Sequence, residues 1–108
     1  MKRYNVLFDR SAEDDLFDIY TYVAINDPVE HADKLFVALR KSCYRLKTSP
    51  LRGHIPSELF EVGIVEFREI SFKSYRIFYS IEKNNVYVHC ILDGRRDIQT
   101  ILQERTLR

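Results

Sequence analysis

The sequence predicts an α+β fold with the element order β-α-α-β-β-β, in which a helical hairpin packs on a mostly antiparallel sheet. Two observations predict it. Three segments rich in aromatic and β-branched residues follow one another between residues 65 and 92, separated by short polar connections. Before them lie two adjacent segments whose apolar residues recur at helical spacing. At 108 residues, the chain is expected to form a single domain over residues 1–108.

The first elements are a short strand and a helix. Residues 4–8 (YNVLF) predict the opening strand, whose partner in the sheet is left open, as is its parallel or antiparallel direction. Ser11 and Asp14 resemble the capping box that begins a helix. The apolar stripe of this helix is Leu16, Ile19, Tyr20 and Val23. The acids Asp14, Asp15 and Asp18 are expected on its solvent-exposed side, where they suit the helix dipole better than acid–base chemistry.

A second helix follows after a very short join. Asp27 is suited to be its N-cap and Pro28 its first helical residue. The helix should end before Pro50, because the residue preceding a proline is disfavoured in the α region. Its apolar stripe comprises Ala32, Leu35, Phe36, Leu39, Cys43 and Leu46. The two helices therefore predict an αα-hairpin.

The second half of the chain contains the sheet. Residues 51–63 are expected to be irregular but packed, and three strands are expected at residues 65–70, 75–81 and 86–92. The short polar connection at residues 82–85 suits a hairpin, with an Asn accepting the positive φ. After the last strand, Asp97 should cap a short helix over residues 97–102.

Composition excludes several classes of protein. No apolar run approaches the roughly 18 residues of a membrane span, and the first residues lack a signal-peptide core, so a cytoplasmic location is expected. Cys43 and Cys90 are too few for a disulfide framework or a zinc site, and each is expected to be a small buried apolar residue. No metal or other cofactor is expected.

The net charge is only +1, but the charges are unevenly distributed. Residues 9–33 contain eight acids and a single Arg. Residues 34–52 contain no acid and six basic residues, Lys34, Arg40, Lys41, Arg45, Lys47 and Arg52. Two interpretations stay open, namely two adjacent solvated helix faces or a basic surface for an acidic partner, protein or nucleic acid.

Four arginines on the strand block are the candidate functional residues: Arg68, Arg76, Arg95 and Arg96. Several of them should converge, with Arg68 and Arg76 on one face if the strand register allows it. A guanidinium group can hold a phosphate or carboxylate through two hydrogen bonds. The alternative is ion pairing with the nearby acids Glu66, Glu69, Asp93 and Asp97.

The histidines carry less information. His31 and His54 are expected at the surface, and His89 is expected to be packed within a strand or to face a sheet edge. The chain has no phosphate-binding glycine loop and no metalloprotease or CxxC motif.

The order of three short motifs resembles the RelE/ParE superfamily of toxins from bacterial toxin–antitoxin modules. The motifs are FREI at residues 67–70, YRIFY at residues 75–79 and GRRD at residues 94–97. The opening strand and the helical hairpin also occur in the superfamily's order, so the resemblance covers nearly the whole chain. The superfamily contains both ribosome-dependent ribonucleases (RelE-like) and inhibitors of DNA gyrase (ParE-like).

The RelE-like alternative implies an mRNA endoribonuclease in which Arg68, Arg76 and Arg96 act electrostatically, with Arg76 and Arg96 at positions that contact the cleaved phosphate. That chemistry also needs lysines on the preceding strand and a tyrosine after the Arg pair. Here acids occupy the strand positions (Glu66 and Glu69), and the tyrosine position falls at or near Leu102. The missing acid and base argue against nuclease activity, because arginines alone cannot transfer the protons.

The ParE-like branch resembles the chain more closely, through the GRRDI turn and the apolar tail that follows it. It implies a non-enzymatic toxin of a plasmid-stabilisation type of module that inhibits DNA gyrase. It also implies a cognate antitoxin, through which alone the toxin reaches operator DNA. The basic residues Lys34, Arg40, Lys41, Arg45 and Lys47, together with the four arginines of the strand block, are the expected target- or antitoxin-binding residues. A degenerate, non-toxic family member is a further alternative.

Overall fold

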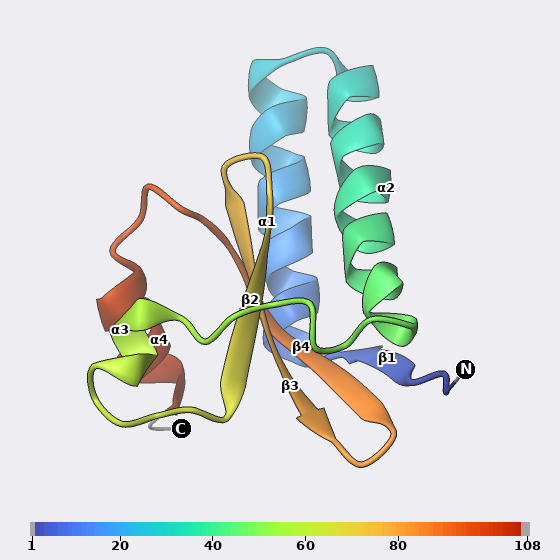
Figure 1. Ribbon diagram of the computed structural model, residues 1–108. Helices are drawn as coiled ribbons and strands as arrows, with labels where there is room; N and C mark the ends of the chain where they lie inside the picture. Colours follow the sequence, from blue (N-terminus) through green and yellow to red (C-terminus); the bar gives the residue numbers. More distant parts are fainter. Residues whose placement is uncertain (1, 107–108) are drawn as a thin grey trace.

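A computed structural model describes residues 2–106 of the chain (Figure 1). The predicted order of strands and helices is confirmed. In chain order the elements are β1 (Asn5–Phe8), α1 (Arg10–Asn26), α2 (Val29–Tyr44), the 3-10 turn η1 (Arg45–Lys47), α3 (Ser57–Phe60), β2 (Phe67–Phe72), β3 (Tyr75–Glu82), β4 (Asn85–Asp93) and α4 (Ile98–Thr106). No helix within residues 2–106 is both long and apolar enough to cross a membrane.

The four strands form one mixed sheet in the order β1-β4-β3-β2. The antiparallel meander of β2, β3 and β4 is as predicted. β1 lies parallel to β4, with Asn5 opposite Asn85 and Phe8 opposite Val88. This pairing resolves the direction that the sequence left open, and it makes β4 an interior strand bonded on both sides. The last residues of β1 thereby lie beside the middle of β4.

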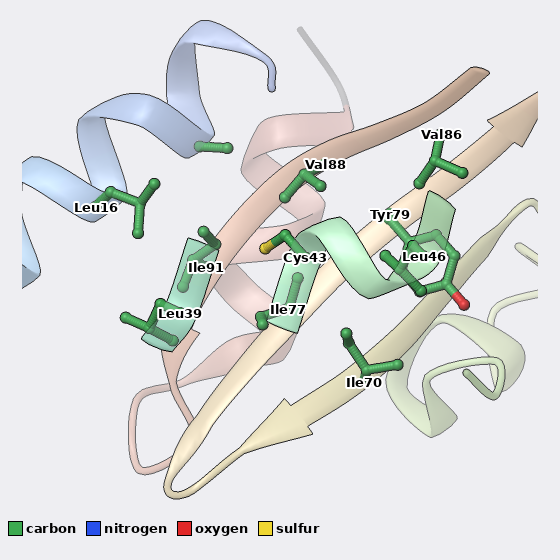
Figure 2. Close-up of a cluster of buried hydrophobic side chains, with 11 residues drawn as sticks. Leu16, Leu39, Cys43, Leu46, Ile70, Ile77, Tyr79, Val86, Val88 and Ile91 are labelled. Atoms are coloured by element: carbon green, nitrogen blue, oxygen red, sulfur yellow. The ribbon is translucent and has the colours of Figure 1, made fainter. Parts of the chain in front are cut away.

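The helical hairpin of α1 and α2 covers one face of the sheet (Figure 1). Its predicted apolar stripes supply the core: Leu16 comes from α1, and Leu39 and Cys43 come from α2 (Figure 2). The sheet contributes buried side chains from three strands, namely Ile70, Ile77, Tyr79, Val86, Val88 and Ile91. Cys43 and Cys90 are both free and buried, as predicted, and burial raises the pKa of the Cys43 thiol to about 12.

The opposite face of the sheet carries a second, smaller core. The short helices α3 and α4 lie on this face (Figure 1), and Leu59 from α3 and Leu102 from α4 are buried there. The sheet side chains beneath them are Phe78, Cys90 and Leu92. The chain thus forms three layers, with the hairpin on one side of the sheet and the two short helices on the other.

Both predicted helix starts in the hairpin need correction. α1 begins after Asp9, and Ser11 caps nothing because its hydroxyl donates to the carbonyl of His89 at 3.0 Å. Asp27 ends α1 through its own N–H, which donates to the carbonyl of Val23 at 2.8 Å, and Pro28 occupies the N-cap of α2. These contacts are tertiary or belong to the preceding helix, so local spacing did not predict them.

The predicted cap of the C-terminal helix is confirmed, but the length of this helix and the residue with positive φ in the β3–β4 turn differ from the prediction. Asp97 caps α4 as predicted, accepting from the N–H of Thr100 at 3.2 Å and from its hydroxyl at 2.8 Å. The helix is longer than the predicted residues 97–102, since it extends to Thr106. In the β3–β4 turn, Lys83 takes the positive φ (56°) that was expected of an Asn.

The irregular segment before the sheet packs less completely than predicted. It contains the single turn of helix α3, from which Leu59 is buried. Leu51 and Phe60 were expected to pack as well, but they are 67% and 64% exposed. Tyr79 helps to hold the segment, because its hydroxyl donates to the carbonyl of Pro50 at 2.7 Å and accepts from the N–H of Gly53 at 3.0 Å. Two backbone hydrogen bonds between His54 and Glu69 also tie the segment to β2.

Candidate functional site

Arg76 lies at the centre of a compact ion-pair cluster on the face that carries α3 and α4. Its Nε and Nη2 donate to the two carboxylate oxygens of Glu69 on β2, at 2.7 and 2.6 Å. Its Nη1 and Nη2 donate to the two oxygens of Glu58 on α3, at 2.7 and 2.8 Å. Arg76 is 20% exposed and Glu69 only 5%. One cation is therefore held between two carboxylates in a largely buried setting.

This arrangement leaves Arg76 little capacity for an external anion. Its hydrogen bonds occupy four of the five N–H donors of a guanidinium group. The hydrogen bond from Arg76 lowers the pKa of Glu58 to about 2, and the two carboxylates raise the pKa of Arg76. Of the two predicted roles, anion binding and ion pairing with nearby acids, Arg76 therefore has the second. Glu69 was among its expected partners, but Glu58 was missed because it lies in the segment expected to be irregular.

Arg68 does not join Arg76, so the expected convergence of these two arginines is wrong. Ser71 is the residue opposite Arg76, and it lies three positions from Arg68 on β2. Because side chains alternate along a strand, an odd separation places Arg68 on the other face of the sheet. There its Nη1 donates to the carbonyl of Gly53 at 2.6 Å, which fixes the loop before α3.

Arg95 and Arg96 follow β4 and border a shallow hollow of about 300 Å³ between α1 and the sheet. Arg95 is 84% exposed and pairs with Asp93, one of its expected acids, at 2.8 Å. The side chain of Arg96 is exposed and makes no hydrogen bond or ion pair with any residue in the described part of the chain. The four arginines therefore do not form one anion-binding cluster, because Arg95 and Arg96 share this hollow whereas Arg68 and Arg76 each lie elsewhere.

The basic run on α2 forms a continuous exposed surface. Lys34, Lys41 and Arg45 follow one another at i, i+7 and i+11, which places them on one side of the helix. Lys34, Val37 and Lys41 line a shallow hollow of about 370 Å³ together with the acid Asp33. None of the three basic side chains forms an ion pair within residues 2–106. We call Lys34, Lys41 and Arg45 the basic surface; Lys47, also exposed, follows in η1.

Arg40 was expected in the same binding surface, but its side chain turns inward between the helices and β1. Its guanidinium lies over the ring of Phe8, 4.6 Å from the centroid, and pairs with Glu13 of α1 at 3.1 Å. It also donates to the hydroxyl of Tyr44 at 3.2 Å. Arg40 thus joins the two helices to β1 and is less available to a partner than its neighbours.

An unpredicted polar chain joins Asp9, the residue between β1 and α1, to β4 and β3 at the edge of a groove. His89 bonds to Asp9 through Nδ1 and shares a 2.7 Å hydrogen bond with Ser80 through Nε2. His89 is half-buried, as expected of a packed histidine, and the edge of its ring packs near Phe67. Asp9 lies 80 residues from His89 in sequence, so only the parallel β1–β4 pairing brings them together.

A second unpredicted pair fastens α4 to α1. Arg105 donates to both oxygens of Asp15 at 2.8 Å, and the N–H of Ile91 donates to the same carboxylate at 2.9 Å. Asp15 is 6% exposed, so its predicted place on the solvent side of α1 is wrong. No local pattern predicts this pair, because the two residues are 90 positions apart.

Solved structures from bacterial toxin–antitoxin systems share this layered fold, and two of them are similar to the chain over most of its length. One is the chromosomal ParDE system from P. aeruginosa, with a TM-score of 0.70, 16% identity and coverage of 82% of this chain and 94% of that one. The other is the RelBE2 toxin–antitoxin complex from Mycobacterium tuberculosis, with a TM-score of 0.64, 20% identity and coverage of 86% and 93%.

The sequence itself matches one family of toxins. The family model described as the ParE toxin of the type II toxin–antitoxin system parDE matches residues 6–98. The chain therefore belongs to the ParE toxin family of type II toxin–antitoxin systems. A search of curated protein sequences finds no match. The predicted resemblance to the RelE/ParE superfamily, with the ParE-like branch favoured, is thus confirmed.

Proposed function

We propose that this ParE-family toxin acts by binding DNA gyrase and inhibiting it, without cleaving RNA. The observation that carries the proposal is the cluster around Arg76. A ribonuclease of this fold needs a cation free to hold the scissile phosphate, but Arg76 is held by Glu58 and Glu69. A guanidinium in this setting contributes to folding rather than to stabilisation of a transition state.

The acids near Arg76 also argue against the RelE-like alternative, a ribonuclease. Glu69 is almost fully buried beside Arg76, and Glu66 is exposed at the groove on the same face. Both acids would repel the phosphates of an RNA strand. His89 is a possible proton-transfer group near this face, but its two ring nitrogens are occupied by Asp9 and Ser80.

The proposal includes a cognate antitoxin in the same module. The basic surface of Lys34, Lys41 and Arg45 suits an acidic antitoxin segment, and Val37 at its centre is 51% exposed and offers an apolar contact. The two structural neighbours come from a ParDE system and a RelBE2 toxin–antitoxin complex. Operator DNA is then reached only through the antitoxin, and the cytoplasm, where gyrase works, is the proposed location.

The experiment is a supercoiling assay of purified gyrase with the purified toxin. We expect loss of supercoiling and accumulation of cleaved gyrase–DNA complex, and addition of the antitoxin should reverse both. The same preparation should leave ribosome-bound mRNA intact. Unchanged supercoiling together with mRNA cleavage that Arg76→Ala abolishes would establish the ribonuclease alternative. Inactivity in both assays, with normal growth on overexpression, would establish the non-toxic alternative.

A further inference from the structure

A groove of about 440 Å³ lies on the sheet face opposite the helical hairpin. It is bounded by α3, α4 and the segment that leads into β2. Six apolar side chains line its interior, namely Leu59, Ile64, Phe67, Phe78, Cys90 and Leu102. A concave site with an apolar floor and a few polar groups at its edge is the common form of a binding site.

The rim of this groove is acidic. Glu66 is exposed there and makes no hydrogen bond or ion pair within residues 2–106. Asp9 and His89 face the groove as a bonded pair. Arg105 is the one permanent cation among the lining residues, and Asp15 neutralises it through two hydrogen bonds. The unpaired carboxylate of Glu66 therefore makes the rim favour a positively charged group of a ligand.

Exposed apolar side chains extend from the groove along the same segment. Three large apolar side chains of this segment are about half exposed or more: Phe60 (64%), Val62 (49%) and Val65 (52%). In sequence they are interspersed with the groove residues Leu59, Ile64 and Glu66. Folding gains nothing from leaving three large apolar side chains in water. Exposed apolar side chains close in sequence to an apolar groove are a feature of protein contact surfaces.

We propose that this acid-rimmed groove binds a segment of a partner protein in which an apolar anchor residue is flanked by Lys or Arg. The anchor enters between Leu59 and Phe78, the cation pairs with Glu66, and the flanking residues cover Phe60 and Val65. A polyanion such as RNA is disfavoured by the same rim. The inference goes beyond the proposed function, because it requires neither gyrase nor any particular antitoxin.

The groove and the basic surface differ in charge and lie on different layers of the molecule. The basic surface comprises Lys34 and Lys41 of α2 and Arg45 of η1. The groove is lined by residues of α3 and α4, which lie on the opposite face of the sheet from α2 (Figure 1). An acidic segment and a basic segment can therefore bind at the same time without competing. The toxin is in this way equipped for two contacts of opposite charge.

The test uses the full chain and the labelled peptide acetyl-GKLFKG-amide, with acetyl-GELFEG-amide and a single-stranded RNA decamer as comparison probes. Binding is measured by fluorescence anisotropy and mapped by amide chemical shifts. We expect saturable binding of the Lys peptide with shifts centred on Leu59, Phe67 and Phe78. No shifts at about 1 mM peptide, an affinity weaker than most specific contacts, would overturn the proposal. So would equal binding of the Glu peptide, or RNA binding in the groove.

Two surface variants locate the contact without disturbing the core. Glu66→Lys should weaken binding of the Lys peptide about fivefold, which is the scale of one exposed ion pair. Its matched control is Glu30→Lys, an equally exposed acid in the first turn of α2. Phe60→Ser should also weaken binding, and its control is Tyr22→Ser on α1, where the side chain is 69% exposed. Equal effects of a variant and its control would show that the peptide binds elsewhere.

Discussion

Arg76 on β3 and Glu69 on β2 form a two-bonded ion pair across adjacent strands, with Nε–Oε2 and Nη2–Oε1 distances of 2.7 and 2.6 Å. The pair is diagonal, because the residue directly opposite Glu69 is Phe78, two positions after Arg76. Glu58 completes it from α3. Arg76 thus joins α3 to the sheet through its pairs with Glu58 and Glu69.

Arg76→Gln should destabilise the fold by about 3 kcal/mol, at the lower end of the range for breaking a buried ion pair. The physical cause is the carboxylate of Glu69, which is 5% exposed and would lose both hydrogen bonds from Arg76, keeping only the ring of His54 at 3.3 Å. Urea unfolding at neutral pH measures the change. Arg95→Gln is the control, because Arg95 is 84% exposed and the loss of its solvent-screened pair with Asp93 should change the urea unfolding transition far less. Equal effects of the two variants would contradict this assignment.

The stability of the fold should depend on pH through Glu58. Its pKa falls from 4.5 to about 2 on folding, mainly because Arg76 donates to its carboxylate. A lowered folded-state pKa means that the stabilisation is complete above about pH 4.5 and is lost as the pH falls toward 2. The excess stability of the wild type over Glu58→Gln should follow that curve in urea titrations. The exposed neighbour Glu61, which makes no ion pair with Arg76, provides the control Glu61→Gln.

Local patterns predicted the parts of the fold whose determinants are close in sequence. The apolar stripes on α1 and α2 and the alternation in the meander are such patterns, and each produced an element within a few residues of its observed bounds. The parallel pairing of β1 with β4 has no local signature. It depends on how the hairpin packs, and it brings Asn5 beside Asn85.

The candidate site was harder to predict for the same reason. Asp15 was placed in water because its neighbours on α1 are acidic, but Arg105 lies 90 residues further along the chain. The chain His89–Asp9 likewise depends on contacts 80 residues apart. Arg68 and Arg76 could be assigned to one face only with the register of β2 against β3, and the observed register separates them. The exposed lysines of α2 were easier, because helical spacing alone places them together.

Gly53→Ala should destabilise the fold by roughly 1–3 kcal/mol, the usual range for overpacking. A Cβ at this position would lie 2.5 Å from the carbonyl oxygen of Glu69 and 2.5 Å from the hydroxyl of Tyr79. Thermal or urea unfolding measures the loss. The double variant with Tyr79→Phe should recover only part of it, since the backbone carbonyl remains in place. Full recovery in the double variant would show that the hydroxyl alone causes the clash.

Arg105→Gln should release α4 from α1 and cost about 3 kcal/mol, because Asp15 is left buried with only the N–H of Ile91 as a partner. Hydrogen exchange should accelerate first in the amides of α4, where Leu102 loses its support. The control is Asp18→Asn, which changes an exposed residue of α1 close to Asp15 and should leave the amides of α4 protected. If the amides of α4 exchange at the wild-type rate in Arg105→Gln, the pair does not hold the helix.

Reversal of charge on the basic surface should slow association with the antitoxin more than it speeds dissociation. Lys34 and Lys41 are exposed, without ion pairs in the described residues, and line one hollow around Val37. Exposed charges act over a Debye length, so they steer the encounter and are screened by salt. The double variant Lys34→Glu with Lys41→Glu should reduce the association rate about tenfold at low salt, and the loss should shrink at about 0.5 M salt. Stopped-flow mixing with purified antitoxin measures both rates.

Reversal of the exposed Arg10 and Lys83, outside this surface, is the control with the same change in net charge. A loss that appears in the dissociation rate and persists at high salt would instead place these lysines in a desolvated contact.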